Sequence, residues 1–163
     1  MDVREELAMR GVLTLELLDT SGTLLERRRV NHLITLRGKQ MLAYLMLALW
    51  PLPTAWAIVV GTGTNEPKDD DSALQTPVDR AEIASTGRNA SRYAPQKDAK
   101  GFVRVTVSAS LPARTEGSTQ PLTEAGVEIT LGKDTKVLFN RVTFAEVNRS
   151  TNMVLNLSWE ISF

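Results

Sequence analysis

The chain has 163 residues, of which 42% are hydrophobic and 23% are charged. This is ordinary globular composition, and a chain of this length can bury about 70% of its unfolded surface. Its 19 basic and 19 acidic residues balance, so no net field attracts nucleic acid or an anionic membrane. We therefore expect neither as a partner. The absence of cysteine excludes disulfides, thiolate zinc sites and thiol nucleophiles.

The amino-terminal segment predicts an arm. It begins Met1-Asp2-Val3-Arg4-Glu5-Glu6, with acidic residues where a signal peptide has basic ones, and no apolar core follows. We expect residues 1–10 to form an arm that reaches onto a neighbouring chain, and residues 11–163 to form a single β-sandwich domain. The apolar run 41–50 is about half the ~20 residues that a membrane helix needs, which predicts a buried helix.

A β-hairpin is predicted first in the chain. Residues 12–18 alternate between apolar and polar, and Asp19-Thr20-Ser21-Gly22 supplies turn residues before a second strand at 23–30. The second strand carries Arg27, Arg28 and Arg29, a charge cluster typical of a solvated or edge strand.

A single helix follows the hairpin. Thr35 is a suitable cap for a helix over residues 36–49, whose apolar face consists of Leu42, Leu45, Met46 and Leu49 at helical spacing. A helix this apolar should lie across a sheet or be covered by another subunit.

The middle of the chain combines one buried strand with long loops. The apolar run 55–60 ends in Gly61-Thr62-Gly63-Thr64, which predicts a strand that leaves the core through a tight turn. Residues 65–77 form a polar loop that contains Asp69-Asp70-Asp71. We expect a further strand at 78–88 and a second exposed loop at 88–100.

The carboxy-terminal half predicts strand after strand. Alternation predicts strands at 103–111, 125–131 and 137–147. The last strand shows one apolar face, made of Met153, Leu155, Leu157, Trp159, Ile161 and Phe163. About eight strands with one helix predict a mainly β fold, an antiparallel, jelly-roll-like β-sandwich.

No motif indicates catalysis. His32 is the sole histidine and has no carboxylate beside it in the sequence, so a structural role is favoured. The Gly61–Thr64 segment lacks the third glycine of a dinucleotide fingerprint and the Gly-Lys-Ser/Thr end of a P-loop. The aspartates at 69–71 lack the spacing of a calcium loop. We predict no catalytic residue, no metal and no cofactor.

The chain does offer candidate interface residues. Trp50 and Trp56 flank a proline-containing connection and would anchor a protein partner if exposed, although core packing is an equal alternative. With the arm and the arginine cluster, the candidate interface is Met1, Val3, Leu7, Arg27, Arg28, Arg29, Trp50 and Trp56.

Three blocks of sequence, taken in order, carry a resemblance. The first is Val30-Asn31-His32-Leu33-Ile34-Thr35 with Leu42-Ala43-Tyr44-Leu45. The second is Ile58 to Thr64, with Asp71-Ser72-Ala73-Leu74 and Arg80. The third is Leu122-Thr123-Glu124-Ala125-Gly126-Val127, with Arg141-Val142-Thr143-Phe144 and Leu155 to Trp159. Together they cover most of residues 30–163 and resemble small β-rich structural proteins of tailed bacteriophages.

The resemblance implies a non-enzymatic virion protein, made in the bacterial host cytoplasm. A capsid decoration or cement protein is the first expectation, with a tail, baseplate or fibre protein as the alternative. Its partners would be copies of itself, as a trimer, and other virion proteins such as the major capsid protein or tail proteins.

Two other functions are left open by the residues themselves. A carbohydrate-binding module could use Trp50, Trp56 and Tyr93 with the aspartates at 69–71. An enzyme would have to depend on His32 or on those aspartates.

Overall fold

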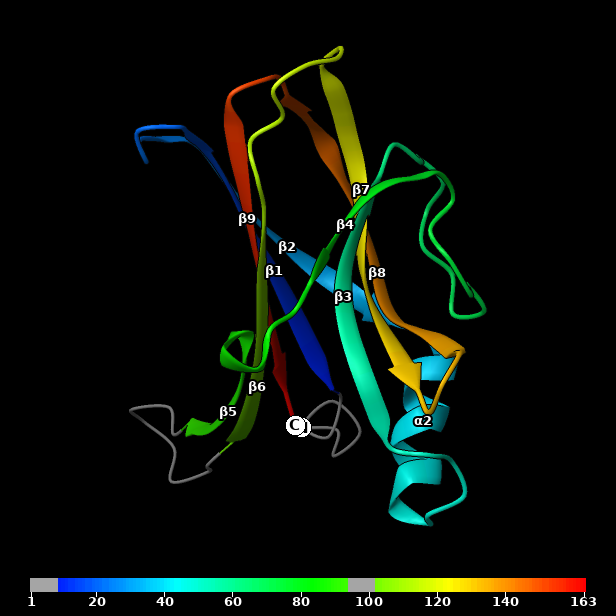
Figure 1. Cartoon of the computed structure of the whole chain (residues 1–163). Coiled ribbons are helices and arrows are strands. Elements are labelled where there is room, and N and C mark those ends of the chain that lie inside the picture. The colour runs from blue at the N-terminus through cyan, green and yellow to red at the C-terminus, as the bar shows by residue number, and fades with distance from the viewer. Residues whose placement is uncertain (1–8, 94–101) are drawn as a thin grey trace, which may run out of the picture.

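A computed structural model describes residues 9–93 and 102–163 of the chain, and within them nine strands form one antiparallel sheet. The strand order is β4-β3-β7-β8-β2-β1-β9-β6-β5, and the sheet curls into a half-barrel (Figure 1). Strands make up more than half of the described residues, so the prediction of a mainly β, antiparallel fold is confirmed, whereas a sandwich or jelly-roll is not.

The first hairpin joins the two halves of the sheet. Strands β1 (Arg10–Asp19) and β2 (Leu24–Ile34) pair with each other, and β1 also pairs with β9 (Met153–Ser162). At its end, β2 pairs through Leu33 and Ile34 with β8 (Thr135–Arg149) of the other half. The hairpin therefore connects the two halves of the curled sheet.

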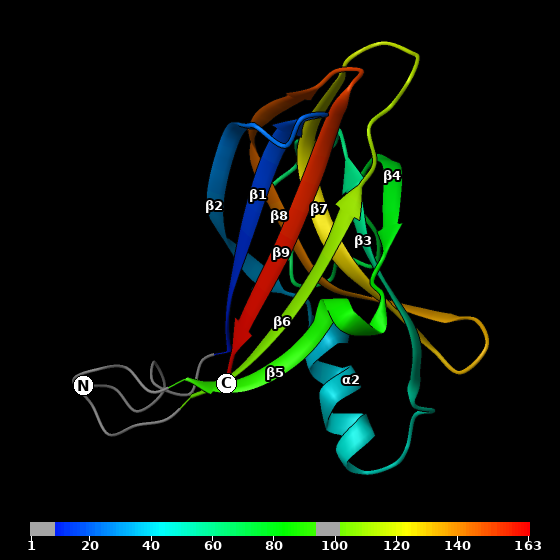
Figure 2. The ribbon, with the colours of Figure 1, turned by 60° about the vertical axis from the view of Figure 1, so that its left-hand side comes forward.

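Helix α2 (Leu36–Met46) lies at one end of the half-barrel (Figure 2). The Thr35 hydroxyl accepts a hydrogen bond from the Gly38 N–H at 3.0 Å and donates one to the Leu138 carbonyl at 2.5 Å. One bifunctional cap thus starts the helix and fixes it to β8.

The packed face of this helix differs from the prediction by one turn. Gly38 and Met41 are buried, and Leu42 and Leu45 pack partly against the core. By contrast, the Met46 and Leu49 residues are 88% and 64% exposed. The reason is steric: a Cβ at position 38 would lie 2.4 Å from the Phe139 carbonyl oxygen, so only glycine allows this contact. The helix also ends earlier than predicted, before Ala48, whose φ is 52°.

The part of the chain that follows the helix supplies both edge strands of the sheet, β4 and β5. Strand β3 (Pro53–Gly61) pairs with β4 (Pro77–Glu82) and with β7 (Gln120–Leu131). A 3-10 turn at Ser85–Gly87 leads to β5 (Arg88–Tyr93), which pairs with β6 (Phe102–Leu111).

Strand β5 was predicted as part of an exposed loop, and this was wrong. Its sequence has no apolar alternation, but its backbone pairs with residues 102–107 of β6. Backbone hydrogen bonding therefore forms this strand without a side-chain signal.

One hydrophobic core fills the curl. It includes Leu13 and Leu15 of β1, Ile58 of β3, Val127 of β7 and the fully buried Trp159 of β9. The predicted apolar face of β9 is confirmed at its buried positions 155, 157, 159 and 161, whereas Phe163 is 48% exposed. In the described part of the chain, no helix combines the length and hydropathy that crossing a bilayer requires.

Candidate functional site

A buried ion cluster, made of Glu124, Arg141 and Asp71, fastens the loop of residues 62–76 to the sheet. The Glu124 side chain of β7 is fully buried, and its carboxylate accepts hydrogen bonds from three backbone N–H groups. These belong to Gly63 at 3.1 Å, Gln75 at 3.1 Å and Thr76 at 2.7 Å.

Arg141 of β8 completes the buried ion cluster. Its guanidinium donates to Glu124 from Nε at 3.0 Å, to the Asp71 carboxylate at 2.7 Å and to the Asn65 carbonyl at 3.1 Å. Burial by itself would raise the pKa of Asp71. The hydrogen bonds from the Lys68 N–H and the Arg141 guanidinium outweigh this effect, so the pKa of Asp71 lies below its ordinary value. The charged side chains of Glu124 and Arg141 therefore hold the loop of residues 62–76 against the sheet.

Two glycines make this arrangement possible. A Cβ at Gly61 or at Gly63 would lie 2.5 Å from the Glu124 carboxylate oxygen Oε1. The Gly61–Thr64 segment was interpreted from sequence as a tight turn, but the role of these glycines is close approach to a buried carboxylate. The aspartates at 69–71 were interpreted as a solvated loop, and Asp69 and Asp70 are exposed as predicted, whereas Asp71 is half-buried and paired with Arg141.

A second buried arginine was missed in the sequence. Arg149 of β8 is 1% exposed and donates to the Asp79 carboxylate at 2.7 Å, to Gln120 at 3.2 Å and to the Pro112 carbonyl at 2.5 Å. No spacing signal marks it, because its partners come from three separate segments.

His32 lies against the core. Its ring is edge-on to Trp159, with 5.6 Å between centroids, and among the described residues neither ring nitrogen has a hydrogen-bond partner. Burial disfavours the charged imidazolium and lowers the pKa of His32 to about 4.

The predicted interface residues do not gather at one place. Met1, Val3 and Leu7 lie outside the described residues. The three arginines lie on β2, where Arg27 is paired with Glu16 at 2.7 Å and Arg28 with Glu26 at 2.5 Å, while Arg29 is exposed.

The two tryptophans are half-buried against the core, which favours the packing alternative. Trp50 is edge-on to Tyr44, with 4.8 Å between centroids, and the guanidinium of Arg88 lies 3.9 Å from the ring centroid of Trp56. Apolar side chains at the end of the helix and just after it are exposed instead: Met46, Leu47, Leu49 and Leu52. The sequence pattern does not reveal these exposed side chains, because Met46 and Leu49 fall at the helical spacing of the predicted packed face.

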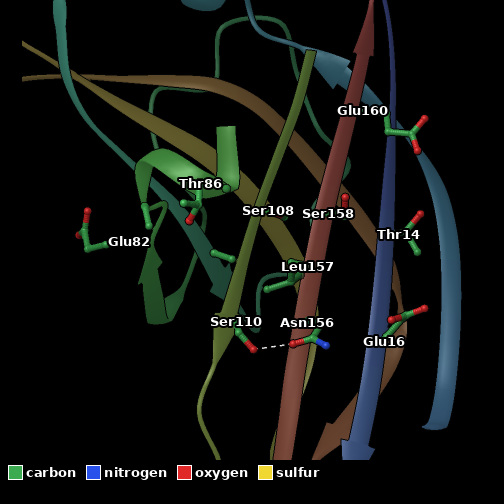
Figure 3. Close-up of a pocket in the computed structure, with 13 residues that line it drawn as sticks. Thr14, Glu16, Glu82, Thr86, Ser108, Ser110, Asn156, Leu157, Ser158 and Glu160 are labelled. Carbon is green, nitrogen blue, oxygen red and sulfur yellow. Dashed lines mark hydrogen bonds between the residues drawn. The ribbon is translucent and has the colours of Figure 1, made fainter. Parts of the chain in front are cut away.

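A shallow polar groove of about 650 Å³ lies on the outer face of β1, β9 and β6 (Figure 3). Its residues include Thr14 and Glu16 of β1, Ser108 and Ser110 of β6, and Asn156, Ser158 and Glu160 of β9. The segment 82–87 contributes Glu82 and Thr86 to one side. The groove arises because the central side chains are short and those at its margins are long.

The chemistry of the groove is that of hydroxyl, amide and carboxylate groups, and none of its lining residues is aromatic. Its carboxylates are paired: Glu16 with Arg27, Glu82 with Arg80 and Glu160 with Arg104. Across the described ranges, no three Asp, Glu or His side chains come together in a way that could hold a metal ion.

Comparison with known proteins adds no relative: no protein-family model, no curated protein and no solved structure matches the chain.

Proposed function

We propose that the chain is a non-enzymatic structural protein of a bacteriophage virion, and most specifically a capsid decoration or cement protein. On this proposal it stabilises the shell through contacts between copies of itself and with the major capsid protein. The jelly-roll-like sandwich belongs to the same proposal, since the two ends of the curled sheet share one core.

The observation that carries the proposal is that the three resembling blocks meet in one structural unit. Leu33 of the first block pairs with Arg141 of the third, and Thr35 of the first block caps α2. Gly63 and Asp71 of the second block bond to Glu124 and Arg141 of the third. The three blocks thus supply the buried contacts that hold the strands, the helix and the loop of residues 62–76 together. This role supports a common fold with the proteins that the blocks resemble.

The surface also suits assembly. Exposed apolar side chains lie at the end of α2 and in the segment that joins it to β3: Met46, Leu47, Leu49 and Leu52. Exposed apolar groups of this kind mark sites of contact between proteins.

A tail, baseplate or fibre protein is the alternative within the class, and a carbohydrate-binding module is the alternative outside it. The tryptophan site expected for a sugar is not favoured, because Trp50 and Trp56 are covered by neighbouring side chains. The polar groove of Figure 3 is the feature that keeps sugar binding as a second candidate.

Co-sedimentation tests the proposal. The labelled chain is mixed with expanded capsids, with procapsids and with tails of the phage that encodes it, and each particle is pelleted. We expect saturable retention on expanded capsids that excess unlabelled chain displaces, together with a higher melting temperature of the shell.

Retention on tails alone would replace the capsid role by the tail alternative. Retention on neither particle, with saturable binding on a glycan array, would overturn the virion proposal in favour of sugar binding. A matched variant for the array is Ser108→Trp with Ser158→Trp, which fills the groove and should abolish binding there.

A further inference from the structure

The floor of the polar groove carries two rows of hydrogen-bonding side chains (Figure 3). Antiparallel pairing across β6, β9 and β1 sets the first row as Ser108, Ser158 and Thr14. The same pairing sets the second row as Ser110, Asn156 and Glu16. Neighbours within a row are about 5 Å apart, and the two rows are separated by about 7 Å along the strands. The groove therefore presents a regular array of polar groups.

One wall of the groove is fixed in place. It is the segment of residues 82–87, in which Ile83 is buried in the core and its N–H donates to the Trp56 carbonyl at 2.8 Å. A Cβ at Gly87 would collide with the Ser108 carbonyl oxygen, so glycine lets this wall lie directly on β6. The groove is thus formed before any ligand arrives, which lowers the cost of binding.

Most hydroxyl groups of the groove are available to a ligand. Ser110 donates to Asn156 at 2.5 Å. Among the described residues, no hydrogen-bond partner occupies the side chains of four others that line the groove: Thr14, Thr86, Ser108 and Ser158. Each hydroxyl can donate one hydrogen bond and accept others, as the hydroxyl groups of a sugar do.

The charges of the groove favour a neutral ligand. Every carboxylate that lines it is paired with an arginine: Glu16 with Arg27 at 2.7 Å, Glu82 with Arg80 at 3.1 Å and Glu160 with Arg104 at 3.3 Å. No excess positive charge is left to attract a phosphate or a carboxylate. The lining also has no aromatic ring on which a nucleobase could stack.

We propose that this groove binds a neutral, linear oligosaccharide, whose hydroxyl groups bond to both rows. From Asn156 to Glu160 the lining extends about 13 Å along β9, which is longer than a single sugar ring. The volume of about 650 Å³ is also that of an ordinary ligand site. This inference turns the second candidate function into a defined site and ligand class, and it does not rest on the virion role.

Nuclear magnetic resonance titration of the isotope-labelled full chain tests the inference. The probes are maltotetraose, cellotetraose and N-acetylated chitotetraose. We expect saturable shifts at groove residues with at least one of them, at a dissociation constant in the millimolar range or below. Because the ligand is neutral, added salt should leave the affinity unchanged. The anionic probe tetragalacturonate should bind several-fold more weakly.

Thr14→Val tests the contact itself, since it removes one hydroxyl and preserves the shape of the side chain. We expect the affinity for the bound probe to fall several-fold. Thr130→Val is the matched control, because Thr130 lies on β7 outside the groove, and its affinity should equal that of the natural chain. Circular dichroism verifies that both variants are folded.

Three results would overturn the inference: no saturable shift at groove residues with any neutral probe, tighter binding of the anionic probe, or equal loss of affinity in both variants. Loss of capsid retention in Thr14→Val, without sugar binding by the natural chain, would instead assign the groove to a protein contact. Capsid retention without sugar binding would refute only this inference. Sugar binding without retention on capsids or tails would refute only the virion role.

Discussion

At the scale of single residues, charge in this protein is buried where it organises a loop. In the sequence, Glu124 looks like an ordinary acidic residue within a strand. Only its position beside Ala125 and Gly126, in the third block of the resemblance, distinguishes it. Its partners Gly63 and Arg141 lie 61 and 17 residues from it in the chain, and Asp71 joins the cluster through its own bond to Arg141. Sequence alone could not assign these contacts, because they depend on which strands become neighbours.

Replacing Glu124 by Gln tests the buried ion cluster. The amide removes the charge that Arg141 neutralises and turns a donor toward backbone N–H groups, so buried groups lose their partner. We expect the free energy of unfolding to fall by about 3–5 kcal/mol, measured by urea denaturation.

The control for this change is Glu128→Gln on the same strand. Glu128 pairs with Arg80 and Lys136 at 3.2 Å, and all three side chains are partly exposed. Exposed pairs of this kind contribute at most about 1 kcal/mol. A similar loss in both variants would contradict the role assigned to the buried ion cluster.

His32 gives the protein a pH dependence. Because its folded pKa of about 4 lies below the ordinary value of 6.5, the unfolded chain binds the proton more readily. Above pH 6.5, where His32 is neutral in both states, it does not reduce the free energy of unfolding. As the pH falls from 6.5 toward 4, the unfolded chain takes up the proton first and the free energy of unfolding declines. The loss is at most about 3 kcal/mol.

Carboxylates also titrate in this range, so the measured quantity is the difference between the natural chain and His32→Phe. We expect that difference in unfolding free energy to change between pH 7 and pH 4 in favour of the variant. A difference that does not vary with pH would show that His32 is not protonated on unfolding.

At the scale of elements, the strands and the helix follow from local sequence, but their packed faces do not. The start of α2 at Leu36 agrees with the prediction because Thr35 caps it. Its buried face was misplaced because the longest apolar stripe extends beyond the sheet that the helix covers. The helix approaches β8 through Gly38, a residue that an apolar pattern does not count.

Substituting Gly38 by Ala tests this contact. In an exposed helix the change would stabilise by about 1 kcal/mol. Here the added Cβ meets the Phe139 carbonyl oxygen, so we expect a loss of about 1–3 kcal/mol in thermal or urea unfolding.

Lys39→Ala is the matched control, since Lys39 is exposed on the same helix. Its effect should stay within about 0.5 kcal/mol. Stabilisation by Gly38→Ala would refute the close packing of α2 on β8.

At the scale of the whole molecule, one core unites strands from both halves of the curled sheet. The alternation of apolar residues in β1, β6 and β9 predicted which side chains enter this core. It did not predict the curl, the short pairing of β2 with β8 at Leu33 and Ile34, or the pairing of β5, because one strand's alternation says nothing about its neighbour.

By itself, the sequence determined that the protein is mainly β, where most strands lie and where its single helix in the described residues begins. These features depend on side-chain periodicity, turn residues and a helix cap, all of which act over a few neighbouring positions. The tertiary structure alone decided the half-barrel, the buried ion cluster, the exposed end of α2 and the short pairing of β2 with β8. Those features depend on contacts between residues distant in the chain, and such contacts form only once the strands have chosen their partners.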